Sequence, residues 1–378
     1  MEARHLEVSP TAPRIYVSCG EASGELQAAL LLERLVQTVP GLAVSGIGGR
    51  RLRAAGVRIR RDNRGWASMG PLAALAKIPK LLAIMWLETL ALVRDPVELV
   101  LLVDFGAFNL RLAQSLRRLG YSGRIAYYFP PSAWLDREGT AREVARTTQP
   151  IVPFAHQRDF YRSLDIEPAY FGHPLASVIQ ERASRPAPAS DAGTLALLPG
   201  SRPQELRFHL PRLLEAAAIL RRDRPRLRAV LAAHDDDSAD RLRAPAEAAG
   251  AEVVRGAQEA LMQADAALIA SGTAVLEAAL TGVPCAALYV LSEAQARIGR
   301  RVYHGRFVTL PNLICGEEIL PECLQEAATP QALAAAVAPL FEGGRSESMR
   351  EDYRRMRALL GTPETLDRIA AFVREMIA

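Results

Sequence analysis

The chain has 378 residues, of which 49% are hydrophobic and 23% are charged, so it is long enough for two domains that each bury a core. Its net charge of +4 is small for this length, and no basic run alternates with aromatic residues, which argues against nucleic-acid binding. The four cysteines form no CxxC pair and no zinc-ligand spacing, a pattern typical of reduced thiols in a cytosolic protein without a metal site.

Strand and helix patterns alternate along the first half of the chain. Residues 1–13 lack an apolar core and predict a loose tail, not a signal peptide. The alternation after them predicts a doubly wound parallel sheet in a first α/β domain, residues 14–180. Its strands are expected at 14–18, 42–46, 99–104 and 124–129, and its helices at 23–39 and 110–119.

The most apolar segment of the chain is residues 71–93. Lys77, Lys80 and Glu88 interrupt it, and its longest uncharged stretch is far too short to span a bilayer. Two interpretations stay open on the pattern alone: an ordinary buried helix and a helix that contacts a membrane surface.

The same alternation restarts after a linker. Residues 181–193 are rich in Ala, Ser and Pro and are expected to join a second Rossmann-like domain, residues 194–345. Its strands are predicted at 195–198, 228–232, 266–269 and 284–289, and its helices at 203–220, 238–249 and 273–280. A polar break is expected at 343–347. The C-terminal helices, within 346–378 and including 365–377, either return to the first domain or exchange between subunits of a homodimer.

Ligands of open α/β sheets bind beyond the carboxyl ends of the strands, so the residues after each strand are the candidates. The Gly20–Gly24 loop matches neither GxGxxG nor a Walker A motif, and a tight turn chosen for packing explains it equally well. The loop Pro199-Gly200-Ser201-Arg202 is more specific, because an arginine at a helix start suits a diphosphate.

Three further positions carry candidate chemistry. Ser271-Gly272-Thr273 repeats the loop design, and Glu277, one turn later, is placed either to accept bonds from ribose hydroxyls or simply on the helix surface. Asp104 ends an apolar strand, where it is either a general base or a turn cap. His173 is equally compatible with a ligand contact and with a hinge or packing role.

Eight motifs occur in an order that resembles one known family. They are the 20–24 loop, Gly46-Ile47-Gly48-Gly49, Phe108-Asn109-Leu110, Pro131-Ser132 with Trp134, Gly172-His173-Pro174-Leu175, Leu197 to Arg202, Ala270 to Thr273 with Leu276-Glu277-Ala278, and Leu310-Pro311-Asn312-Leu313. On these motifs the chain resembles the lipid-A-disaccharide synthase family over nearly its whole length after Pro13.

The resemblance implies a GT-B fold, in which two nucleotide-type domains face a cleft. It also implies an inverting, metal-independent glycosyltransferase without a cofactor, peripheral on the cytoplasmic side of the inner membrane. The implied donor is a UDP-activated acylated glucosamine, the implied acceptor an acylated glucosamine phosphate, and the products a β(1→6) disaccharide and UDP.

Roles also follow from the resemblance, position by position. Asp104 is the expected base and Arg202 the phosphate-side catalytic arginine. The remaining UDP-binding residues are expected to be Gly200, Ser201, Ser271, Gly272, Thr273 and Glu277. The expected acceptor or cleft residues are Glu21, Ser23, Gly24, Asn109, His173 and Asn312. The acyl chains of the substrates give segment 71–93 a membrane role, carried by Leu72, Leu75, Ile78, Leu81 and Leu82.

The chain departs from the family pattern at three places in the first domain. Glu25-Leu26-Gln27 replaces a usual Asp and His, Ala107 replaces a second carboxylate, and Leu135-Asp136 interrupts a Trp-rich run. The motifs of the second domain are nearly intact. Two alternatives therefore remain: a related enzyme with another UDP-sugar or acceptor, and a non-catalytic UDP-sugar- or lipid-binding protein.

Overall fold

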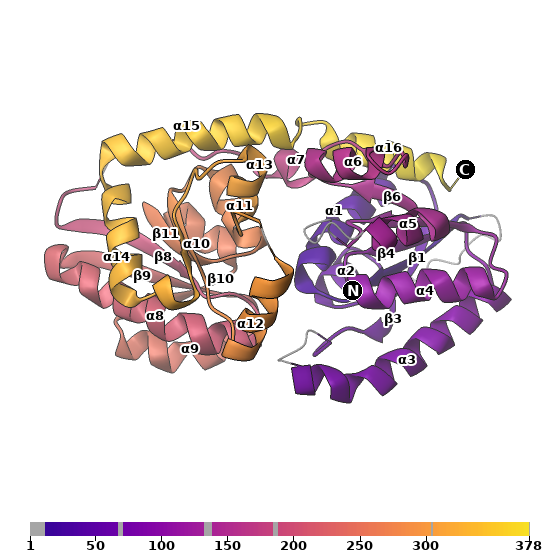
Figure 1. The fold of residues 1–378 in the computed structure, drawn as a ribbon, viewed down its shortest axis with the longest axis horizontal. Coiled ribbons are helices and arrows are strands. Elements are labelled where there is room, and N and C mark those ends of the chain that lie inside the picture. The colour runs from indigo at the N-terminus through magenta and orange to yellow at the C-terminus, as the bar shows by residue number, and fades with distance from the viewer. Residues whose placement is uncertain (1–11, 67–70, 132–137, 184–187, 304, 378) are drawn as a thin grey trace, which may run out of the picture. The chain divides into compact units, whose positions relative to one another are not determined.

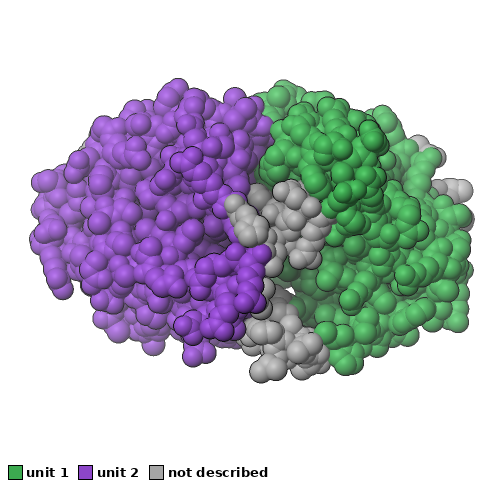
Figure 2. All heavy atoms as spheres, in the orientation of Figure 1, with its two compact units in different colours: residues 1–177, 361–378 green, residues 178–360 purple. Residues whose placement is uncertain are grey.

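The computed structural model describes residues 12–66, 71–131, 138–183, 188–303 and 305–377. The chain divides into two compact units (Figure 2): unit 1 contains residues 1–177 and 361–378, and unit 2 contains residues 178–360. The chain thus leaves unit 1 after Ser177 and returns to it after Leu360. Both units are α/β, which confirms the predicted fold class.

Unit 1 is a parallel sheet in the order β3-β2-β1-β4-β5-β6-β7, with helices between its strands (Figure 1). Its strands are β1 (Arg14–Cys19), β2 (Ala43–Gly48), β3 (Arg58–Asp62), β4 (Leu99–Val103), β5 (Arg124–Tyr128), β6 (Gln149–Val152) and β7 (Ala169–Tyr170). Its helices are α1 (Ala22–Thr38), α2 (Arg50–Ala54), α3 (Pro71–Arg94), α4 (Gly106–Arg118), α5 (Glu138–Thr147), α6 (Ala155–Arg162) and α16 (Thr365–Glu375), and α7 (Leu175–Val178) lies at the unit boundary.

The central strands of unit 1 are buried on both faces of the sheet. Successive side chains of a strand point to opposite faces, so each strand contributes to two cores. Ile15 and Val17 of β1 belong to a core that also contains residues of α1, α2 and α16. Tyr16, between them, belongs to the core on the other face, with residues of α3, α4 and α5. Edge strand β3 is mostly exposed and arginine-rich, which explains why its sequence did not predict a strand.

Unit 2 repeats this architecture in the strand order β10-β9-β8-β11-β12-β13, again with all pairs parallel. Its strands are β8 (Ala192–Leu198), β9 (Arg226–Ala233), β10 (Ala251–Arg255), β11 (Ala266–Ala270), β12 (Cys285–Tyr289) and β13 (Glu322–Leu324). Its helices are α8 (Pro203–Asp223), α9 (Asp236–Ala248), α10 (Ala257–Gln263), α11 (Thr273–Thr281), α12 (Glu293–Val302), α13 (Leu310–Cys315), η2 (Gln325–Ala327), α14 (Pro330–Val337), η3 (Ala338–Phe341) and α15 (Gly343–Leu360).

The two C-terminal helices belong to different units. Helix α15 is part of unit 2, whereas α16 packs on α1 of the same chain in unit 1. Leu366, Ile369 and Val373 of α16 lie in the unit 1 core, and Asp367 pairs with Arg34 at 3.0 Å. Formation of a homodimer stays a prediction.

The polar break expected at 343–347 was wrong, because these residues form the first turns of α15. Within the segment Ser346 is buried, and the other four residues are exposed. Ser346, Met349 and Tyr353 are buried at the i, i+3, i+7 spacing of one helix face, so packing within unit 2 holds the helix. Helix α4 likewise begins at Gly106, four residues before the expected start, which places Asn109 in its first turn.

Candidate active site

The turn after β4 places Asp104 at the carboxyl edge of the unit 1 sheet. Asp104 and Phe105 both adopt the left-handed backbone region, with φ angles of 50° and 53°. Residues other than glycine rarely occupy this region, and each such residue costs about 1–3 kcal/mol. The turn therefore persists only because its surroundings hold it in place.

Asn109 holds this turn from within unit 1. Its side chain is fully buried, and Nδ2 lies 2.8 Å from the Asp104 carbonyl oxygen and 3.2 Å from that of Val103. Its Oδ1 accepts a hydrogen bond from Ser18 Oγ at 2.6 Å. The hydroxyl of Tyr127 donates to the Asp104 carbonyl at 3.0 Å, and burial raises the Tyr127 pKa well above its usual value.

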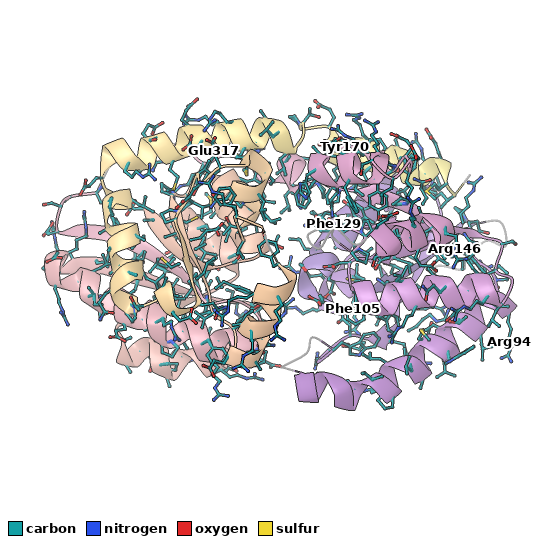
Figure 3. All side chains as sticks on the ribbon, in the orientation of Figure 1. Arg94, Phe105, Phe129, Arg146, Tyr170 and Glu317 are labelled. Atoms are coloured by element: carbon teal, nitrogen blue, oxygen red, sulfur yellow. The ribbon has the colours of Figure 1, made fainter. Side chains whose placement is uncertain are left out.

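The 20–24 loop packs directly against the same turn. A Cβ atom on Gly20 would lie 2.3 Å from the ring of Phe105, which Figure 3 labels, so no larger residue fits there. A Cβ atom on Gly24 would lie 3.0 Å from that of Asp104, and Ser23 Oγ donates to Asp104 Oδ2 at 3.3 Å. The structure thus brings Ser23, Gly24, Asp104 and Asn109 together.

Glu25, one of the departures from the family pattern, has a structural role. Its carboxylate oxygen Oε1 accepts hydrogen bonds from the backbone N–H groups of Gly49, Arg51 and Leu52 at 2.9, 2.9 and 3.1 Å. It therefore closes the N-terminus of α2, where a negative charge is stabilising. Glu21, within the 20–24 loop, is the N-cap residue of α1 and is half-buried.

His173 is buried, and its contacts favour packing over ligand binding. Its Nδ1 accepts the backbone N–H of Leu175 at 3.2 Å, so the ring proton lies on Nε2. The ring contacts those of Phe129, labelled in Figure 3, and Phe154 at centroid distances of 5.2 and 5.4 Å. Burial lowers the His173 pKa to about 3, so the imidazole is neutral at pH 7.

In unit 2, residues 199–202 connect β8 to the N-terminus of α8. Gly200 has a φ of 101°, and Arg202 is the N-cap residue. The backbone N–H groups of Ser201 and Arg202 donate to Glu205 Oε2 at 2.9 and 3.1 Å. The Arg202 guanidinium donates to Glu205 Oε1 at 3.2 Å. The predicted phosphate loop therefore holds a carboxylate.

His209 supports this loop, although no sequence pattern predicted its role. Its side chain is fully buried, with Nδ1 2.9 Å from the Pro199 carbonyl and Nε2 accepting the Val290 N–H at 3.1 Å. Nδ1 therefore carries the proton, and burial lowers the His209 pKa. The residue lies in the middle of a helix outside every recognised motif, so no sequence signal identified it.

The 271–273 loop follows β11, the neighbour of β8. Strand pairing sets Ile269 beside Leu198, so the 199–202 and 271–273 loops emerge side by side. Gly272 is the N-cap residue of α11, and Ser271 Oγ donates to the Val308 carbonyl at 3.5 Å. Glu277 is half-buried, with Gln258 Nε2 3.4 Å from its Oε2.

Asn312 is fully buried, and its side chain is used within unit 2. Nδ2 donates to the Leu320 carbonyl and to Glu322 Oε1, whereas Oδ1 accepts the N–H groups of Ile319 and Leu320. Glu322, also missed, accepts the N–H groups of Val308 and Thr309 at 2.8 and 2.9 Å as well. Asn312 thus positions residues 308–313 next to Ser271.

The helix α3 carries an exposed apolar face. The exposed side chains are Ile78, Leu82, Trp86, Leu87 and Leu90. Leu81 packs against the core of unit 1. Glu88 faces inward, 1% exposed, and pairs with Arg60 and Arg61 of β3 at 3.2 and 3.1 Å. Leu72 and Leu75 belong to α3, but their side chains lie outside the described part of the structure, as do Trp134, Leu135 and Asp136.

Two features are absent from the described part of the chain. Within it, no helix combines the length and the apolar character that crossing a bilayer requires. Across the same residues, His, Cys, Asp and Glu side chains form no group of three or more that could hold a metal ion.

Comparisons with known proteins place the chain in one group of relatives. Residues 15–375 match a family model described as lipid-A-disaccharide synthetase. The lipid-A-disaccharide synthase of Myxococcus xanthus is 37% identical, over 97% of this chain and 98% of its own. That of Syntrophus aciditrophicus is 33% identical, over 96% and 97% of the two chains.

Solved structures share the fold at low sequence identity. The calicheamicin glycosyltransferase CalG4 is 17% identical and superposes with a TM-score of 0.60, over 97% of this chain and 98% of its own. Staphylococcus aureus MnaA, solved with UDP, is 12% identical with a TM-score of 0.63, over 96% of each chain. The fold is therefore of the GT-B class, as predicted.

Proposed function

The chain belongs to the lipid-A-disaccharide synthase family and is a hexosyltransferase of lipid A biosynthesis, and from this premise we propose its reaction. It transfers a 2,3-diacylglucosamine unit from UDP to the 6-hydroxyl of 2,3-diacylglucosamine 1-phosphate. The products are a β(1→6) disaccharide and UDP. The observation that carries the proposal is the strained turn of Asp104, which Asn109 and Tyr127 hold at the carboxyl edge of the unit 1 sheet.

Asp104 is the proposed general base. It takes the proton of the acceptor 6-hydroxyl while that oxygen bonds to the anomeric carbon of the donor and the bond from this carbon to UDP breaks. A single base without a covalent nucleophile gives inversion at the anomeric carbon. The hydrogen bond from Ser23 Oγ to Asp104 Oδ2 orients the carboxylate.

The proposed site for UDP lies in unit 2. Departure of UDP places negative charge on the diphosphate, and the N-termini of α8 and α11 offer N–H groups and positive dipole ends to it. The Arg202 guanidinium adds a charged donor pair. These groups are the proposed substitute for a metal ion. Glu277 is the proposed acceptor for a ribose hydroxyl.

The exposed face of α3 is the proposed contact with the inner-membrane surface. Trp86 and Leu87 are 49% and 53% exposed on it, and Lys77 and Lys80 precede them. An apolar face with basic neighbours is typical of helices that lie in a lipid interface. This contact would place the enzyme where its acylated substrates reside, on the cytoplasmic side.

The decisive experiment offers the purified protein both proposed substrates. UDP release and disaccharide formation are expected, and nuclear magnetic resonance of the product would give the β(1→6) linkage. Absence of product, with a known lipid-A-disaccharide synthase active in parallel, would reject the proposed substrates. Full activity only in the presence of added divalent cation would reject metal independence.

In a second candidate function, the donor is again a UDP-sugar and only the acceptor differs. Ala107 is exposed in the first turn of α4, next to the Asp104 turn, where the family pattern has a carboxylate. Loss of a charge there favours a less polar or differently substituted acceptor. A panel of acylated and non-acylated acceptors with one UDP-sugar separates this candidate from the first, because only the preferred acceptor changes.

A further inference from the structure

The predicted phosphate loop of unit 2, residues 199–202, already binds an anionic group, the carboxylate of Glu205. One of its oxygens accepts the N–H groups of Ser201 and Arg202, and the other pairs with the Arg202 guanidinium. These are the donor groups that a diphosphate at this loop would use. The carboxylate therefore occupies the place of the ligand.

Glu205 accepts more hydrogen bonds than the corresponding residue of an ordinary capping box. In a capping box the third helical residue accepts the N–H of the N-cap residue, here Arg202. Glu205 additionally accepts the N–H of Ser201, one residue earlier, and a guanidinium N–H. The Glu205 side chain is 16% exposed, and that of Arg202 is 42% exposed, so solvent and solutes reach the pair.

The shape of the loop makes room for this oxygen. Gly200 has a φ of 101°, and a Cβ atom built on it would lie 2.3 Å from Glu205 Oε2. Any residue other than glycine at position 200 would place its own Cβ atom in this space. The space beside Gly200 is thus a cradle for an anionic oxygen, and Glu205 fills it.

We propose that Glu205 is an internal competitor for the diphosphate of UDP, one that leaves the loop when the donor binds and returns when UDP departs. The inference rests on the proposed function. Carboxylate and phosphate oxygens accept the same charge-assisted bonds, and two anions cannot share them without strong repulsion. Glu205 thereby weakens UDP binding and assists the release of UDP. A residue that only contacts the substrate would instead strengthen its binding.

The test compares Glu205→Gln with the unaltered full-length chain. The amide keeps the size of the side chain and one acceptor oxygen but removes the charge, so it competes less well. We expect UDP to bind about fivefold more tightly to Glu205→Gln in isothermal titration calorimetry. Inorganic pyrophosphate should show the same gain. Glu215→Gln, an exposed position on the same helix, should leave both affinities unchanged.

A second readout separates competition from support of the helix. The loss of the charged cap should lower the melting temperature of the free Glu205→Gln protein, whereas its stabilisation by UDP should increase. Weaker or unchanged UDP binding by Glu205→Gln would overturn the inference and make Glu205 a support of Arg202. If UDP binds neither protein and no transfer occurs, the proposed function fails as well. Normal transfer with equal UDP affinities rejects the inference alone.

Discussion

Asn109 Nδ2 lies 2.8 Å from the carbonyl oxygen of Asp104, and this bond joins the first turn of α4 to the left-handed residue that directly follows β4. The amide of Asn109 holds the backbone of Asp104 and not its carboxylate. Asp104 is therefore held in a conformation that residues other than glycine rarely adopt, at the sheet edge where ligands of such folds bind. The strained backbone conformation and the proposed chemical role therefore coincide at Asp104.

Replacing the carboxylate should separate chemistry from binding. Asp104→Asn keeps the shape of the turn but removes the base, so transfer should fall by about 10²–10⁴-fold. UDP affinity, measured by calorimetry, should stay within twofold. Asp159→Asn, at an exposed position on α6, is the matched control. Retention of most activity by Asp104→Asn would remove Asp104 from the role of base.

Asn109→Ala should destabilise unit 1. It leaves the Asp104 carbonyl and Ser18 with fewer partners in a buried environment, at a cost of about 2–4 kcal/mol. Urea unfolding measures this loss, and transfer activity should fall with it. Arg111→Ala, on the exposed side of the same helix, should change stability by less than about 0.5 kcal/mol. Equal stabilities of the two variants would contradict the role given to Asn109.

Arg202→Ala should impair use of the donor. The guanidinium is the proposed cation for the leaving diphosphate, so kcat/KM for the UDP-sugar should fall by about 10²–10³-fold. Arg222→Ala, near the other end of α8, is the control with the same change of charge. A similar loss in both variants would point to net charge and not to a defined contact.

Acid should destabilise unit 1 through His173. Its pKa is about 3 in the fold against 6.5 in the unfolded chain, so the unfolded state binds more protons between these values. Stability contributed by the neutral ring is therefore full above pH 6.5 and falls as the pH drops below it, by about 2 kcal/mol at pH 5. In chemical denaturation, His173→Gln should show a shallower loss over this range.

The exposed face of α3 predicts vesicle binding. Changing Trp86 and Leu87 together to Ser removes two exposed apolar side chains, and we expect binding to anionic phospholipid vesicles to weaken about tenfold or more. Co-sedimentation measures it. Leu359→Ser, equally exposed at 55% but on α15 of unit 2, should bind as the unaltered chain does.

Much of the fold was predictable because its signals are local. Buried parallel strands such as Leu99–Val103 are continuous apolar runs, and helices such as Ala22–Thr38 show their own periodicity. Polar or short edge strands, such as Arg58–Asp62, lacked that signal. The segment 343–347 was misjudged because burial of one helix face outweighed its polar composition.

Motif and position along the chain were enough to identify the residues that carry candidate chemistry, Asp104, Arg202 and Glu277. The groups that hold these residues in place come together only in the folded chain. Asn109 is 91 residues from Ser18, and His209 is 81 residues from Val290, yet each pair is hydrogen-bonded. Such partners are chosen by strand order and by the need to satisfy every buried polar group, which no local pattern encodes. For the same reason the carboxylate of Glu205 in the phosphate loop became visible only in the folded chain.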